Sequence, residues 1–263
     1  MSVGVVEKLQ TIAENVQKVY DNGFQNGFEN AKSDFWVGFT DYNRRMNYRY
    51  AFAFGWYDDF LPPATPIKIK NGYDADCMFY FSTIGNVDEK IVDFSKQKIF
   101  YRTFAGSRTT DVTIDVASAK VLEETFRDGH TLLNLTIKNL SADCKFVNTF
   151  GTTTGYGMPL DCLNLTGTIG QDGFDLWSAI YLSRDSIINV MNALSTTTNG
   201  FTVRLAKRAV DSAFETEEGA NDGSTSAEWL ALVNSRPNWV VSFERSPTAP
   251  TELLENGTGL GYN

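Results

Sequence analysis

The sequence predicts an α/β protein whose centre is a β-solenoid, with a helical stem before it and a cap of helices and strands after it. Three observations predict this class. The pair Thr-Phe recurs at intervals of 22 and 24 residues in the centre of the chain, apolar residues follow a heptad spacing near the start, and helical and β-prone stretches alternate after residue 183. The expected units are a stem over 1–36, an aromatic N-terminal cap over 37–66, the repeats over 67–182, a C-terminal cap over 183–244 and an extended tail over 245–263.

Composition and charge exclude several classes of protein. With 263 residues, of which 42% are hydrophobic, the chain is large enough to bury a core. Its formal net charge of -9 disfavours binding to nucleic acid, because phosphate binding needs a basic face. The start lacks a basic segment followed by an apolar run, and no stretch is apolar over the ~20 residues that span a bilayer. We therefore expect a soluble protein without membrane insertion.

The three cysteines, Cys77, Cys144 and Cys162, include no close pair. A disulfide framework needs an even number of cysteines, and a zinc site needs closely spaced ones. We therefore expect three buried thiols in a chain that folds in a reducing compartment. The basic pairs Arg44–Arg45 and Lys207–Arg208 are interpreted as solvated or salt-bridged rather than as a phosphate site.

The stem is predicted from a heptad seam near the start of the chain. Its residues alternate at spacings of four and three, as in a coiled coil. The predicted oligomerisation residues are Val5, Leu9, Ile12, Val16 and Val19. β-Branched residues at one of the two seam positions favour three or more strands, so a trimer is the preferred homo-oligomer. The alternative is a helix that packs on its own domain or on a larger assembly.

The repeats are predicted from aligned residues in the middle of the chain. The Thr-Phe pairs end at Phe104, Phe126 and Phe150, and an apolar residue lies ten positions before each of them. Those apolar residues are Phe94, Val116 and Leu140. Two further registers, at Phe81 and Trp177, are weaker. So small a unit buries its apolar face only by stacking on its neighbours, which predicts a ladder of parallel strands; a β-sandwich with regular strands is the alternative.

Both flanks suit the closure of a solenoid. Upstream, tyrosine, phenylalanine and tryptophan are dense before Pro62 and Pro63, which predicts an aromatic cap. Downstream, the sequence predicts a helix with Ser183 at its N-cap, a strand over 201–205, a second helix over 226–235 and a strand over 239–243. The apolar positions of the first of these helices are Ile187, Ile188, Met191 and Leu194.

These segments together resemble a known family. The stretches IAENVQKVY, NYRYAFAFGW, LSRDSIINVMNAL and NWVVSF, with the Thr-Phe repeats, resemble BspA-like leucine-rich-repeat proteins of phages and prophages of gut Firmicutes, encoded near tail genes. The resemblance covers roughly residues 5–243, although the repeats hold few leucines and little of the asparagine ladder. It implies a leucine-rich-repeat-like solenoid in a virion-associated protein, and it supplies no catalytic residues.

The residues themselves indicate little chemistry. His130 is the one histidine and stands without a Gly-x-Ser-x-Gly motif, so a surface position is expected. Asp74 and Asp76, and the acidic residues of 215–222, lack the spacing of a calcium loop. The glycines of 151–157 lack a nucleotide-binding context. Paired carboxylates such as Asp58–Asp59 leave polysaccharide cleavage as a minor alternative. No enzyme, cofactor or metal site is expected.

The predicted function is that of a bacteriophage structural protein, an adhesion module of a tail fibre or baseplate that binds the host surface. A capsid decoration or head-fibre protein is the alternative. Expected partners are other virion proteins, copies of the chain itself and a host surface glycan or protein. The expected location is the virion, after synthesis in the host cytoplasm. The candidate binding residues are aromatic or lie in loops: Tyr42, Tyr48, Trp56, His130 and Tyr156.

Overall fold

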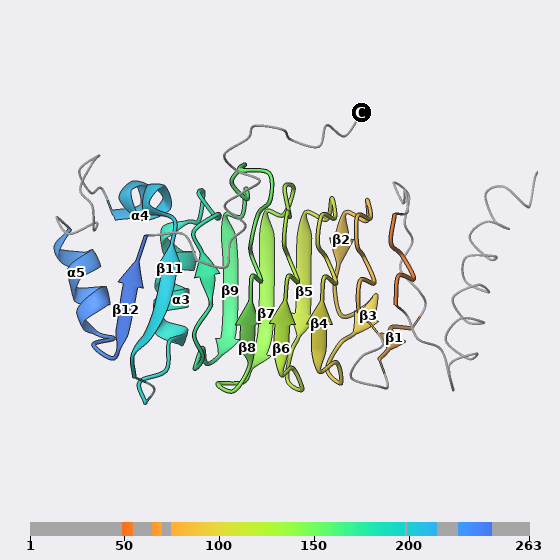
Figure 1. The fold of residues 1–263 in the computed structure, drawn as a ribbon, viewed down its shortest axis with the longest axis horizontal. Coiled ribbons are helices and arrows are strands. Elements are labelled where there is room, and N and C mark those ends of the chain that lie inside the picture. The colour runs from red at the N-terminus through yellow and green to blue at the C-terminus, as the bar shows by residue number, and fades with distance from the viewer. Residues whose placement is uncertain (1–48, 55–64, 70–74, 198, 215–225, 244–263) are drawn as a thin grey trace, which may run out of the picture.

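The computed structural model describes residues 49–54, 65–69, 75–197, 199–214 and 226–243. Its body is a parallel β-solenoid of about five turns, whose coils lie side by side along the long axis of the molecule (Figure 1). The predicted stack of repeats is therefore confirmed, and the alternative of a β-sandwich is wrong. The predicted stem, with its seam from Val5 to Val19, lies outside the described residues.

Two parallel sheets form two sides of the coils. The longer sheet has the strand order β2-β5-β7-β9, and the shorter sheet has the order β4-β6-β8. The longer sheet consists of β2 (Asn86–Val87), β5 (Asp111–Asp115), β7 (Asn134–Leu140) and β9 (Cys162–Gly167). The shorter sheet consists of β4 (Ile99–Tyr101), β6 (Val121–Glu123) and β8 (Lys145–Val147). A further parallel pair, β1 (Ile67–Lys68) with β3 (Val92–Asp93), lies toward the N-terminal end of the solenoid.

The core lies between these sheets because alternate residues of each strand point inward. Ile114 of β5 is opposite Ile137 of β7, which is opposite Leu165 of β9, and all three are buried. Their neighbours along each strand are polar and face outward. A slip of one residue would expose this apolar row, so the alternation sets the register between coils.

The third side of each coil is a pair of tight turns around the repeated phenylalanine. The residue two positions before it has a φ between 48° and 60° in five coils, and the members of this set are Tyr50, Cys77, Arg102, Glu124 and Asn148. Residues other than glycine seldom adopt this conformation. Here the backbone is held by bonds between coils: Phe104 N donates to Thr125 O at 2.9 Å, and Phe126 N donates to Thr149 O at 2.9 Å. Stacking of the coils therefore offsets the local strain.

The repeated phenylalanines form one row, which we call the phenylalanine ladder: Phe52, Phe79, Phe104, Phe126 and Phe150. Neighbouring ring centroids are 5.1 to 5.6 Å apart, with planes 5° to 15° from parallel. The predicted row of Phe104, Phe126 and Phe150 is thus confirmed. Phe174 ends the stack with its ring at 73° to that of Phe150.

The two weaker sequence registers are wrong. Phe79 and Phe174 occupy the places predicted for Phe81 and Trp177, and Phe81 lies two residues after Phe79 and is partly exposed. Phe52 adds a ladder position inside the segment predicted as an aromatic cap, where residues 49–54 have the same pair of turns as the repeats. The repeat conformation therefore begins before residue 67.

The threonine of each Thr-Phe pair satisfies a buried carbonyl of the preceding coil. The hydroxyl of Thr125 donates to Phe100 O at 2.7 Å, and that of Thr149 donates to Leu122 O at 2.5 Å. Both threonines are fully buried. The pair recurs because phenylalanine stacks in the core while threonine removes an unpaired acceptor beside it.

Replacing Thr125 with valine is expected to lower the free energy of unfolding by about 1–3 kcal/mol, because valine keeps the shape and leaves the Phe100 carbonyl without its donor. Urea denaturation followed by circular dichroism measures the change. Thr113→Val is the matched control, since Thr113 lies on the outward face of β5, where the exchange should change stability by less than about 0.5 kcal/mol. Equal stability of the two variants would contradict the role given to Thr125.

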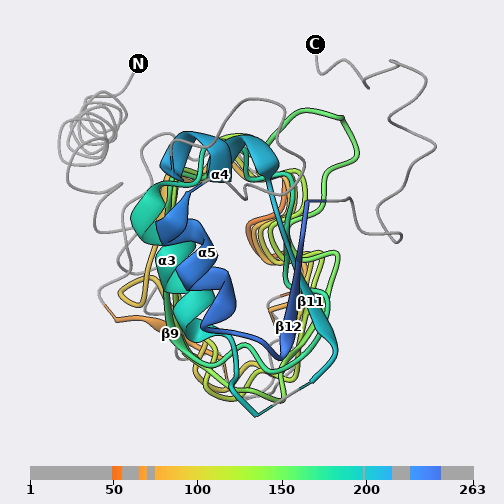
Figure 2. The ribbon, with the colours of Figure 1, turned by 90° about the vertical axis from the view of Figure 1, so that its left-hand side faces the viewer.

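The C-terminal end is closed by helices and by a third parallel sheet. This sheet has the order β10 (Asp175–Leu176), β11 (Phe201–Leu205) and β12 (Trp239–Ser242). Helix α3 (Arg184–Ala193) connects β10 to β11, and α4 (Lys207–Phe214) and α5 (Ala227–Asn234) connect β11 to β12. Seen end-on, α3 and α5 lie on the side of β9, and β11 and β12 lie opposite (Figure 2).

Helix α3 also covers the exposed edge of the longer sheet. Leu163 N of β9 donates to the Ser186 hydroxyl at 2.8 Å, and Leu165 N donates to Asn189 Oδ1 at 2.6 Å. Side chains of the helix thus replace the next strand, which prevents pairing with another chain at this edge. Ser183 is at the N-cap as predicted, but its hydroxyl donates to Asp161 O instead of capping α3.

The structure contains both helices and both strands predicted for this end, together with α4, which the sequence interpretation missed. The basic pair Lys207–Arg208 begins that helix. Lys207 Nζ lies 2.5 Å from Asp211 Oδ2, and the Arg208 guanidinium lies 5.3 Å from the Tyr181 ring centroid. Lys207 is therefore salt-bridged and Arg208 is exposed, as expected, whereas Arg44 and Arg45 lie outside the described residues.

The cysteines differ from one another in burial. Cys77 and Cys144 are buried as predicted, and burial raises the pKa of the Cys144 thiol to about 12. The same prediction is wrong for Cys162, which is partly exposed. Its position explains the difference, because it begins β9 at a site that points away from the core.

Candidate binding groove

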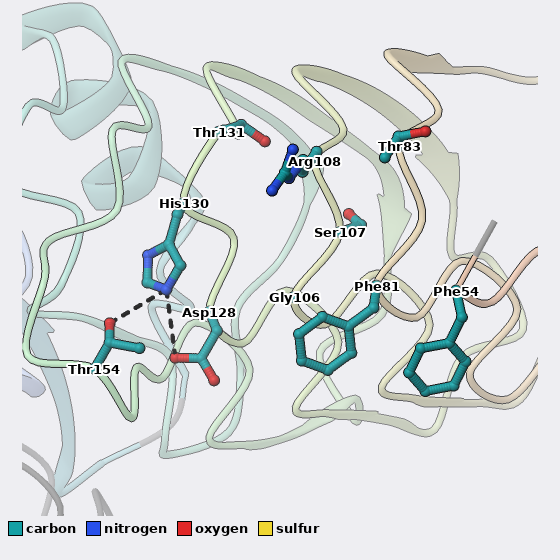
Figure 3. Close-up of a pocket in the computed structure, with 10 residues that line it drawn as sticks. All are labelled: Phe54, Phe81, Thr83, Gly106, Ser107, Arg108, Asp128, His130, Thr131 and Thr154. Carbon is teal, nitrogen blue, oxygen red and sulfur yellow. Dashed lines mark hydrogen bonds and ion pairs between the residues drawn. The ribbon is translucent and has the colours of Figure 1, made fainter. Parts of the chain in front are cut away.

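A groove of about 580 Å³ runs along the solenoid at the corner that follows the phenylalanine ladder (Figure 3). The described residues of its lining come from successive coils: Phe54, Phe81, Thr83, Gly106, Ser107, Arg108, Asp128, His130, Thr131 and Thr154. Coils of a parallel solenoid are spaced by about 4.8 Å, so the four steps from Phe54 to Thr154 span roughly 19 Å. The groove is therefore elongated along the axis of the molecule.

One end of the groove is aromatic. The rings of Phe54 and Phe81 have centroids 5.8 Å apart and planes within 8° of parallel, and both turn their faces to the same side (Figure 3). Both residues follow a ladder phenylalanine by two positions and have positive φ. This backbone conformation directs the rings outward instead of into the core. Phe54 remains 66% exposed.

The next coil has glycine at the same position, and the aromatic end depends on it. A Cβ on Gly106 would lie 2.7 Å from the nearest atom of the Phe81 ring. The φ of Gly106, +63°, also favours glycine. Its missing side chain lets the Phe81 ring lie flat along the groove.

The other end of the groove is polar. Asp128 Oδ1 accepts a hydrogen bond from Thr153 N at 2.6 Å, and Oδ2 accepts one from the Thr153 hydroxyl at 2.8 Å. Asp128 thereby fixes the loop of the next coil. His130 Nε2 lies 3.2 Å from the Thr154 hydroxyl and 3.9 Å from Asp128 Oδ1. The other ring nitrogen of His130 makes no hydrogen bond with the part of the chain that the structure describes.

Between the two ends, Arg108 and several hydroxyl side chains line the groove. The Arg108 side chain lies between Ser107 and His130 along the groove (Figure 3). The backbone below is bonded to neighbouring coils, since Phe81 N donates to Ala105 O and Asp128 N donates to Gly151 O. Side chains, rather than free backbone groups, therefore determine what this surface contacts.

No family model, curated protein or solved structure matches this chain.

The contacts of His130 differ from those of a nucleophilic triad. In such a triad the carboxylate orients the ring through one nitrogen while the other nitrogen activates the hydroxyl. Here Asp128 and Thr154 both approach Nε2 (Figure 3). Asp128 is also the one carboxylate among the described lining residues, whereas hydrolysis of a glycosidic bond uses two that face each other.

The described residues include no cluster of three or more side chains suited to hold a metal ion. Among those same residues, no helix has the length and apolar character needed to cross a membrane. Asp74 and the acidic residues of 215–222, considered above for calcium, lie outside the described residues.

The candidate residues from the sequence divide into three groups. His130 lines the groove, and Tyr156 is 72% exposed in the adjoining loop but does not line it. Tyr42, Tyr48 and Trp56 lie outside the described residues. Sequence reasoning missed the aromatic end, although the position of Phe81 two residues after Phe79 would have indicated it once the correct ladder residue was known.

A charged network connects the turns to the polar end of the groove. Glu124 accepts hydrogen bonds from Arg102 and from Arg127, the latter at 2.8 Å. Arg127 Nε also lies 3.4 Å from Asp128 Oδ2, an ion pair without hydrogen-bond geometry. Burial raises the pKa of the Glu124 carboxyl, but the bonds from the two arginines outweigh burial and hold the pKa below its ordinary value.

This lowered pKa predicts a loss of stability in acid. A carboxyl whose pKa is lower in the folded state stabilises the protein above its unfolded pKa of about 4.3, and the contribution disappears as the pH falls through the folded value. Glu124→Gln should therefore be less stable than the wild type at pH 7, and the difference should shrink below about pH 4.3. Urea titrations from pH 7 to pH 3 measure it.

Glu123→Gln is the matched control for this prediction, since Glu123 is adjacent and forms no ion pair within the described residues. Its difference from the wild type should remain nearly constant with pH. A Glu124→Gln difference that is equally constant would show that the network does not stabilise the fold.

Proposed function

We propose that the protein is a bacteriophage structural protein whose solenoid is a non-catalytic recognition module, carried on a tail fibre or baseplate, that binds the host surface through the groove. The resemblance to BspA-like leucine-rich-repeat proteins of phages supports the setting. The groove supports the activity, because it combines an aromatic surface with polar groups on a preformed concave site.

The observation that supports binding most strongly is the preorganisation of the lining. The backbone N–H groups of Phe54, Phe81, Gly106 and Asp128 each donate to the next coil, and the Asp128 side chain is fixed by two bonds to Thr153. A rigid surface loses little conformational freedom when a ligand binds, so more of the contact energy contributes to affinity. This property suits an attachment protein, which must present the same surface on every copy.

The leucine-rich-repeat character of the solenoid is part of this proposal. Parallel strands on one side of each coil, and a terminal cap of α3, β11, α4, α5 and β12, are compatible with that class. The predicted trimeric stem would place several grooves on one particle. Several weak sites that act together would strengthen attachment without further contacts at each site.

Cell binding tests the proposal. The full chain, fluorescently labelled, is expected to bind host cells and to compete with adsorption of the phage. The double variant Phe81→Ala/His130→Ala should lose most of this binding because it removes one group from each end of the groove. Thr136→Ala is the control, since Thr136 lies on the outward face of β7, away from the groove. No binding by the wild type, or equal binding by the double variant, would refute the proposal.

Location on the particle separates the alternatives. Gold-labelled antibodies against the chain should mark the tail tip or baseplate in electron micrographs of intact virions. Labelling of the head would favour a capsid decoration or head-fibre protein. Release of reducing sugar ends from host polysaccharide by the purified chain would favour the minor alternative, an enzyme that degrades it.

A further inference from the structure

We infer that the ligand of the groove is a linear, uncharged carbohydrate, with one sugar ring on the Phe54–Phe81 surface and the hydroxyl groups of another at Asp128 and His130. This inference rests on the proposed binding function and names the class of ligand. It follows from the order of groups along the groove, from the shape of the groove and from the hydrogen bonds that its backbone N–H groups make with the next coil.

The aromatic end matches one side of a sugar ring. A pyranose presents C–H groups on one side and hydroxyl groups around its rim, so it needs a flat apolar surface with polar side chains at the edge. Phe54 and Phe81 provide that surface, because both rings line the groove, their planes lie within 8° of parallel, and the absence of a Cβ on Gly106 leaves room for the Phe81 ring. Hydroxyl side chains of Thr83 and Ser107 line the same groove.

The polar end matches hydroxyl groups. Asp128 offers a carboxylate as acceptor, Thr154 a hydroxyl that donates and accepts, and His130 a ring nitrogen without a partner among the described residues. Asp128 is held by Thr153, and His130 by Thr154, so these groups are oriented before a ligand arrives. Binding hydroxyl groups in this way requires fixed donors and acceptors at close range.

Charge and shape exclude two other ligands. Arg108 and Asp128 place opposite charges along the groove, and the chain has a net charge of -9, so a polyanion would be repelled. An extended peptide would pair with free backbone groups, but the backbone N–H groups of Phe81, Gly106 and Asp128 are bonded to the next coil. The volume of about 580 Å³ lies within the range of roughly 300–1,000 Å³ typical of small-molecule sites.

Treatment of host cells distinguishes a glycan ligand from a protein ligand. Periodate, which cleaves vicinal diols of sugars, should abolish binding of the labelled full chain, whereas protease treatment should leave binding unchanged. The reverse result, with binding still sensitive to Phe81→Ala and His130→Ala, would overturn the carbohydrate inference and leave the proposed attachment function standing. Absence of any cell binding would instead refute the proposed function.

Direct titration with purified sugars tests the carbohydrate inference independently of cell binding. Isothermal titration calorimetry of the full chain with uncharged trisaccharides of glucose, galactose and N-acetylglucosamine should detect binding of at least one of them. Phe81→Ala and His130→Ala should each weaken that binding at least tenfold, and Thr136→Ala should leave it unchanged. Binding of none of the three sugars, or binding that both groove variants retain in full, would overturn the inference.

Discussion

Replacing Phe126 with alanine is expected to lower the free energy of unfolding by about 3–5 kcal/mol, because the substitution leaves a cavity in the middle of the core. Phe126 is fully buried, and its ring stacks on those of Phe104 and Phe150 at 5.6 and 5.5 Å. Each coil of a solenoid contacts mainly its neighbours, so a cavity here weakens both interfaces of one coil. The polar end of the groove begins two residues later, at Asp128, and should lose its order as well.

Urea denaturation followed by far-UV circular dichroism measures this effect, with Leu133→Ala as the control. Leu133 is also apolar and lies between Phe126 and Phe150 in the sequence, but it is 43% exposed, so its truncation should change stability by less than about 1 kcal/mol. If Phe126→Ala also lost less than about 1 kcal/mol, the ladder would not be the main contact between coils.

Replacing Gly167 with alanine is expected to destabilise the protein by about 3 kcal/mol or more, through backbone strain and a steric clash. The φ of Gly167 is +111°, a value that residues with a Cβ rarely adopt. The added Cβ would lie 2.2 Å from Leu140 O, a backbone atom of the preceding coil that also accepts a hydrogen bond from Thr168 N. Relief of the clash would therefore separate β7 from β9 at their C-terminal ends.

Thermal unfolding of Gly167→Ala and of the control Gly85→Ala checks this expectation. No atom lies within 4 Å of a Cβ built on Gly85, and its φ is outside the left-handed range, so alanine there should be nearly neutral. A lower melting temperature for Gly167→Ala alone is the expected result. Equal melting temperatures would mean that the two coils can separate here without loss of stability.

The solenoid could be predicted because its repeats leave local patterns in the sequence. Alternating apolar residues place Ile114 and Ile137 on the face of the sheet that points into the core, and the Thr-Phe pairs mark the buried turn. The ladder residues at the two ends of the solenoid could not be predicted from a fixed interval along the chain, since successive ladder phenylalanines are 22 to 27 residues apart. Loops of different length absorb these differences, so only the pairing of the coils shows that Phe79, rather than Phe81, belongs to the ladder.

The groove was the harder feature to predict. His130 was expected at the surface, and it is exposed there. Its neighbours in the groove come from other coils, and the side of the coil on which each one lies depends on the positive φ two residues after the ladder. That conformation occurs at Phe54, Phe81, Gly106 and Asp128, which include an aromatic residue, glycine and an acid, so no single residue type marks the position.

The amino-acid sequence by itself determined that the chain repeats, that Phe104, Phe126 and Phe150 lie in the core, and that helices and strands close its C-terminal end, because these properties follow from the periodicity of neighbouring residues. Tertiary structure alone decided which phenylalanines stack, how α3 covers the edge of β9, and which side chains meet in the groove. Those features depend on the register between coils, and register is set by contacts between residues some 25 positions apart rather than by local propensity.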